Sequence, residues 1–151
     1  MKYLAWTVAV FLALFFQSRL SFLGVKPDLT ILLAYYAGIR YGERRGLLIG
    51  VLIGAVEDSV SSTIIGPNLL AKGLIGYFAS SFVSGGFLRW TPVLGAIAAG
   101  ILTFVDNSIV FLLRSIFDTM PAMPTTALYV AAMQSLLSTP VGIFIRPRHA
   151  D

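Results

Sequence analysis

The sequence lacks cysteine entirely and contains a single histidine, His149. The absence of cysteine excludes disulfides and thiolate metal sites, and one histidine argues against imidazole catalysis or a histidine-bound metal. The Gly-x-Ser-x-Gly, His-Glu-x-x-His and phosphate-binding glycine motifs are also missing. We therefore expect a protein that is not an enzyme and has no cofactor and no bound metal.

Charged residues are scarce as well. They make up 12% of the 151 residues, whereas 57% are hydrophobic, and the mean hydropathy is +0.85. Soluble domains average about 25% charged residues. Because so few charges cannot cover a surface that faces water, the composition predicts an integral membrane protein whose surroundings are the lipid bilayer.

Long apolar runs dominate the chain, and they do not alternate as strands would. A helix needs about 20 apolar residues to cross a hydrocarbon core. We expect one all-α domain, a polytopic bundle of six transmembrane helices at residues 3–17, 28–41, 46–64, 67–86, 91–113 and 125–145. The first is expected to be a retained helix rather than a signal peptide, because no small-residue cleavage site follows it.

Basic residues predict the orientation of this bundle. With six spans, one side holds Lys2, Arg40, Arg44, Arg45, Arg89, Arg146 and Arg148, and the other holds Arg19, Lys26 and Arg114. Cytoplasmic loops are enriched in lysine and arginine, so we expect both termini and the basic turn at Arg40, Arg44 and Arg45 to be cytoplasmic. The pI near 9.7 then reflects the excess of basic residues on the cytoplasmic side of the bundle. No interleaving of aromatic and basic residues suggests nucleic-acid binding.

Glycines recur at every fourth position in one segment, at Gly42, Gly46, Gly50 and Gly54. This spacing places small residues along one face of a helix, where a second backbone can approach closely. Two interpretations stay open. The groove that these glycines form along the helix serves packing within the bundle, or it receives a helix of a partner protein.

Four charged side chains lie deep within the predicted spans, away from the span ends that contain Asp28 and Arg40: Glu57, Asp58, Lys72 and Asp106. At a rise of about 1.5 Å per residue, Glu57 and Asp58 lie about 18–20 Å above the basic turn. The same reckoning places Lys72 and Asp106 at a similar level in the outer half of the bundle. Charges at such depth need partners, water or a proton. The cluster is either a structural ion pair of Lys72 with Glu57 or Asp58, or a functional site.

Short motifs between residues 25 and 82 resemble one known family. They are Lys26-Pro27-Asp28-Leu29, Gly42-Glu43-Arg44-Arg45-Gly46, Gly50, Gly54-Ala55-Val56-Glu57-Asp58, Gly66, Asn68, Leu70 and Gly76-Tyr77. In this order and spacing they resemble the bacterial rod shape-determining protein MreD family. Glu57 departs from the family pattern, which usually has an apolar residue before the aspartate. After Phe87 only the general hydropathy is similar.

The resemblance implies a non-enzymatic subunit of the cell-elongation complex in the bacterial inner membrane. Members of the family associate with MreC and, through the complex, with MreB, RodA and a class B penicillin-binding transpeptidase that build side-wall peptidoglycan. Their fold is thought to resemble the substrate-binding subunits of energy-coupling-factor transporters. A solute-binding transporter subunit therefore stays open as the alternative, and a cavity that reaches the acidic cluster would favour it.

Overall fold

Six helices form the described part of the chain in the computed structural model, which describes residues 2–21, 24–61, 65–84, 91–117 and 123–145. They are α1 (Lys2–Arg19), α2 (Leu29–Tyr41), α3 (Glu43–Val60), α4 (Pro67–Ser84), α5 (Pro92–Phe117) and α6 (Pro124–Gly142), and no strand occurs in these ranges. The all-α prediction is confirmed, with one helix in each predicted segment. Residues 62–64 and 85–86, at the ends of two predicted spans, lie outside the described ranges.

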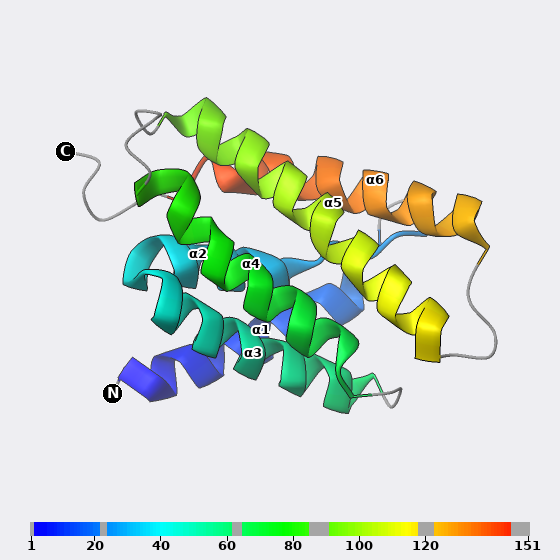
Figure 1. Ribbon diagram of the computed structural model, residues 1–151, viewed down its shortest axis with the longest axis horizontal. Helices are drawn as coiled ribbons and strands as arrows, with labels where there is room; N and C mark the ends of the chain where they lie inside the picture. Colours follow the sequence, from blue (N-terminus) through cyan, green and yellow to red (C-terminus); the bar gives the residue numbers. More distant parts are fainter. Residues whose placement is uncertain (1, 22–23, 62–64, 85–90, 118–122, 146–151) are drawn as a thin grey trace.

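Consecutive helices alternate in direction, so that α1, α3 and α5 run one way and α2, α4 and α6 run back (Figure 1). In this view α5 and α6 lie together along the upper side, and α2, α3 and α4 fill the middle. Helix α1 begins at the lower left and passes behind α3 in this view, and it packs against α2. The apolar core between these groups includes Ile31, Tyr35, Ile75 and Leu102. The alternation places the α2–α3 turn and the α3–α4 connection at opposite ends of the bundle.

Gly42 forms the turn between α2 and α3. Its φ of +85° lies in a region that side chains disfavour, and its N–H donates to the carbonyl oxygen of Gly38 at 3.0 Å. A Cβ on Gly42 would meet nothing within 4 Å. The backbone turn therefore accounts for Gly42, and it lets α3 begin at Glu43 instead of residue 46.

The other three glycines of the segment lie where α3 meets α4. A Cβ on Gly46, Gly50 or Gly54 would overlap the carbonyl oxygens of Gly76, Lys72 and Asn68, respectively. Gly76 on α4 faces Gly46 in the same way. In the structure the α3 groove is therefore filled by the backbone of α4, as expected for small residues at a close helix crossing.

Among the described residues, only α5 is both long and apolar enough to cross a membrane by itself, with 26 residues. The apolar stretch Ala5–Arg19 is shorter. Helix α2 has 13 residues, and α3 carries charged side chains near both of its ends. Their length and their charges thus make α2 and α3 less suited than α5 to cross a bilayer without neighbouring helices.

Candidate functional site: a buried ion cluster

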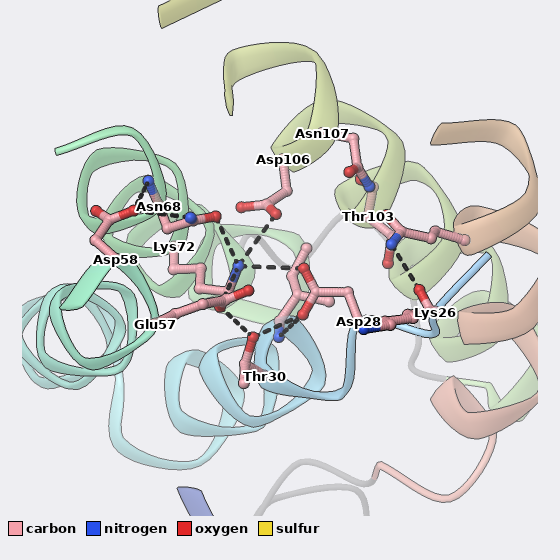
Figure 2. Close-up of polar contacts among 12 residues, drawn as sticks. Lys26, Asp28, Thr30, Glu57, Asp58, Asn68, Lys72, Thr103, Asp106 and Asn107 are labelled. Atoms are coloured by element: carbon pink, nitrogen blue, oxygen red, sulfur yellow. Dashed lines mark hydrogen bonds and ion pairs between the residues drawn. The ribbon is translucent and has the colours of Figure 1, made fainter. Parts of the chain in front are cut away.

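Lys72 is fully buried at the centre of a cluster of charges (Figure 2). Its Nζ lies 2.9 Å from Glu57 Oε2, 3.1 Å from Asp28 Oδ2 and 3.5 Å from Asp106 Oδ2. We refer to Asp28, Glu57, Lys72 and Asp106 as the ion cluster. Its members come from the start of α2, from α3, from α4 and from α5. One ammonium group therefore connects four helices.

Asp28 enters the cluster because it caps α2. The residue is buried and has extended backbone angles, and its Oδ1 accepts the backbone N–H of Ile31 at 3.1 Å. This is the usual geometry of an N-cap, in which a side-chain oxygen satisfies an unpaired amide of the first turn. The second oxygen, Oδ2, remains free to accept from Lys72. One carboxylate thus fixes the start of α2 and holds the ammonium group.

Thr30 joins two of the carboxylates. Its Oγ1 lies 2.6 Å from Asp28 Oδ1 and 2.6 Å from Glu57 Oε2, and the residue is fully buried. Both contacts are short even for hydrogen bonds between oxygen atoms. The hydroxyl therefore bridges the start of α2 to the last turns of α3.

Asp58 does not contact Lys72. It is fully buried and accepts hydrogen bonds at the start of α4, from the backbone N–H groups of Gly66 at 2.8 Å and Leu69 at 3.1 Å. It also accepts from the side-chain amide of Asn68 at 2.8 Å. The Oδ1 of Asn68 lies 3.4 Å from Lys72 Nζ, which links Asp58 to the ion cluster indirectly. Asp58, a residue of α3, thus caps α4.

Replacing Asp58 with alanine is expected to lower the free energy of unfolding by about 2 kcal/mol, at the upper end of measured cap losses, because several buried donors lose their acceptor. Thermal unfolding in detergent measures the effect. Asp58→Asn keeps one acceptor oxygen, so its free energy of unfolding should lie between those of Asp58→Ala and the wild type. Ser59→Ala, at an exposed neighbouring position, is the control and should match the wild type. Equal stability of Asp58→Ala and Ser59→Ala would contradict this role.

The structure therefore brings together Glu57, Lys72 and Asp106 of the four ionisable residues singled out by the sequence. The expected alternative pairing of Lys72 with Asp58 is wrong, because successive residues of a helix point about 100° apart. Asp28, Thr30 and Asn68 were not expected at this site. The sequence did contain a signal for Asp28, because the Pro27-Asp28 pair marks the start of a helix. In an up-and-down bundle the start of α2 lies at the same end as the end of α3 and the start of α4, so the Asp28 carboxylate is brought to that end.

The basic turn lies at the other end of α3. Arg40, Arg44 and Arg45 are exposed there, and Glu43 Oε1 accepts from Ser81 Oγ at 3.3 Å. Glu57 lies thirteen positions after Arg44 along the chain, a helical rise of about 20 Å. The three arginines thus present positive charge far from the ion cluster.

Two half-open apolar cavities of about 260 Å³ each occur in the described part of the molecule. The first is lined by residues of α5 and α6, among them Phe111 and Leu128. The second lies between α4 and α5, beside Phe78 and Ile101. No member of the ion cluster lines either cavity. Neither cavity therefore gives a solute access to the buried charges.

A helical bundle that pairs an ion cluster in its interior and exposes many large apolar side chains on its surface defines a helical protein of membrane type. The family model described as rod shape-determining protein MreD matches residues 1–147 of the 151-residue chain. The chain therefore belongs to the MreD family, a family of membrane proteins with a role in rod-shape determination. No curated protein and no solved structure gave a significant match.

The family match confirms the resemblance seen in the sequence and extends it. The motifs recognised between residues 25 and 82 lie on α2, α3 and α4, whereas the family match also includes α1, α5 and α6. Asp106, the α5 member of the ion cluster, lies within the matched residues. The cluster as a whole is therefore part of the family domain.

Proposed function

We propose that the protein is a non-enzymatic subunit of the bacterial cell-elongation complex that supports side-wall peptidoglycan synthesis. In this role it docks MreC and, through the complex, meets MreB, RodA and a class B penicillin-binding transpeptidase. The observation that carries the proposal is the MreD family match over residues 1–147. The physical arguments below support the same role.

The outer surface of the bundle suits lipid and partner helices. Helix α1 exposes Phe11 and Phe15 to 62% and 57%, and α6 exposes Leu128 and Leu136 to 61% and 67%. The charged groups of the ion cluster face inward. Large apolar faces of this kind mark contact with a membrane or with another protein. A rigid bundle with such faces can hold single-helix partners without catalysing a reaction.

The proposed setting is the inner membrane, crossed six times, with both termini in the cytoplasm. The alternating helix directions support this topology (Figure 1). The exposed arginines of the α2–α3 turn support the cytoplasmic assignment of that end. A fold like that of the substrate-binding subunits of energy-coupling-factor transporters is part of the same proposal.

The alternative is a solute-binding subunit of a transporter. Such a site needs polar groups that face an accessible cavity. In this structure the carboxylates of the ion cluster contact Lys72 and Thr30, and the two apolar cavities lie elsewhere. The geometry therefore favours the assembly role over solute binding.

Purification of the tagged protein from native membranes in mild detergent, followed by mass spectrometry, tests the function. We expect MreC and the elongation enzymes to co-purify, and we expect cells depleted of the protein to lose their rod shape. Recovery of a transporter ATPase pair without MreC would contradict the proposal and support the alternative.

The double variant Arg44→Ser, Arg45→Ser is expected to reduce recovery of MreB at least several-fold, since both side chains are exposed at the proposed cytoplasmic end. Its thermal midpoint in detergent should stay at the wild-type value. Lys26→Ser removes an exposed charge from the opposite end and serves as the control. Equal loss of MreB with Lys26→Ser would show that net charge, and not this turn, matters.

A further inference from the structure

We propose that the ion cluster is a proton-binding site, in which Glu57 carries a proton that it donates to Thr30. Thr30 in turn donates to Asp28. This inference is independent of the partners proposed above. It depends on hydrogen-bond geometry, on the charges that surround Glu57 and on one buried oxygen atom of Asp106 that has no hydrogen-bond partner within the described part of the chain.

The first argument is a count of hydrogen atoms at Thr30. A threonine hydroxyl has one hydrogen to donate, yet Oγ1 lies 2.6 Å from a carboxyl oxygen on each of two residues, Asp28 and Glu57. Two oxygens this close without a hydrogen between them would repel. The second contact therefore needs a hydrogen supplied by one of the carboxyl groups, which then donates to Thr30 while Thr30 donates to the other.

The surroundings assign that hydrogen to Glu57. Asp28 caps α2, and the partial positive charge of a helix N-terminus favours the ionised form of a capping carboxylate. Glu57 lies near the C-terminal end of α3, where the helix dipole has the opposite sign. A neutral Glu57 can still accept from Lys72 through a remaining lone pair of Oε2. The order of donation is thus Glu57 to Thr30 to Asp28.

The second argument is the balance of charge. Three carboxyl groups surround the single ammonium group of the cluster, Lys72 from α4: Asp28 from the start of α2, Glu57 from α3 and Asp106 from α5. If all four were ionised, two negative charges would stay uncompensated in the interior. Asp58 does not change this balance, because it is directed toward the start of α4. Burying unpaired charge is expensive, and a proton on Glu57 removes half of the excess.

The third argument is the unpartnered oxygen of Asp106. The residue is 1% exposed, its Oδ2 lies 3.5 Å from Lys72 Nζ, and its Oδ1 has no hydrogen-bond partner among the described residues. Figure 2 shows the carboxyl group directed at the cluster. A buried acceptor without a donor is rare in folded proteins. A carboxylate that is buried with an unpartnered oxygen and a long contact to its cation is poorly stabilised in its charged form, so we assign Asp106 as the site of a second proton, which would cancel the remaining negative charge.

Infrared spectroscopy tests the site on the folded, full-length protein in a maltoside detergent, which has no carbonyl group. A protonated carboxyl shows a C=O stretching band that a carboxylate lacks. The chain contains two glutamates, Glu43 and Glu57. Labelling the glutamate side-chain carboxyls with ¹³C should therefore shift the band at neutral pH, and no substitution is needed for this result.

Variants locate the proton. Glu57→Gln should abolish the shifted band, whereas Glu43→Gln, at an exposed position, should leave it unchanged. Thr30→Val should keep a protonated group but move its band to higher frequency, because the hydrogen bond to Oγ1 is lost. A wild-type protein without any carboxylic acid band at neutral pH would overturn the proposal. If the band does not shift on glutamate labelling and disappears in Asp106→Asn, the assignment to Glu57 is overturned.

Discussion

Gly50→Ala is expected to lower the free energy of unfolding by about 3 kcal/mol, at the upper end of the cost of overpacking. The added Cβ would overlap the carbonyl oxygen of Lys72, and it would lie 3.1 Å from the Cα of Gly73. Both are backbone atoms of α4, which cannot move aside without separating the helices. Gly50→Leu should prevent recovery of folded protein altogether. Thermal unfolding in detergent and the yield of monodisperse protein measure these effects.

Two controls isolate the backbone contact. Gly73→Ala adds a Cβ at the same helix crossing, but its nearest neighbour is the end of the Val51 side chain at 2.7 Å. A side chain can turn away, so this variant should lose clearly less stability than Gly50→Ala. Leu48→Ala changes a side chain of α3 that is 60% exposed and should have little effect. A similar loss for all three variants would refute the argument from backbone contact.

Lys72→Met is expected to cost about 3–5 kcal/mol, the range found when one partner of a buried ion pair is removed. Methionine has a similar length but leaves Asp28, Glu57 and Asp106 without their shared cation. The variant should unfold at a much lower temperature or fail to accumulate in membranes.

Second substitutions distinguish lost charge balance from lost packing. Adding Asp106→Asn to Lys72→Met leaves one fewer buried acidic group to be neutralised without the ammonium group, so the double variant should be more stable than Lys72→Met alone. Lys26→Met removes an exposed lysine and should match the wild type. If Asp106→Asn makes Lys72→Met less stable still, electrostatic compensation is not the reason for the loss.

Helix positions could be predicted from the sequence because backbone chemistry marks them. Pro67, Pro92 and Pro124 begin α4, α5 and α6, as expected of a residue that needs no N–H in the first turn. Gly42 ends α2 with a positive φ. These signals are local, so the printed sequence contains them. The ends of α3 and α5 differ from expectation by several residues, because hydropathy changes gradually there.

The candidate site could be predicted only in part. A count of helical rise gives depth along the bundle axis, and it correctly placed Glu57, Lys72 and Asp106 at one level. It does not give the direction around each helix, so it could not separate Glu57 from Asp58. Asp28 was recognised as a helix start and not as a ligand of Lys72, since a cap is a local feature and the ion pair spans residues 28 and 72.

The contact between α3 and α4 also fixes how the two helices can slide. The carbonyls that fill the positions of Gly46, Gly50 and Gly54 belong to Gly76, Lys72 and Asn68, so both series advance by four residues in opposite directions. A displacement of one helix by a fraction of a turn would bring side chains onto positions that only hydrogen can occupy. The next matching alignment lies about 6 Å away, four residues along the axis. A shift to that alignment would also break the hydrogen bonds of Asp58 to the start of α4 and the Lys72–Glu57 pair, so the contacts hold α3 and α4 in a single axial alignment.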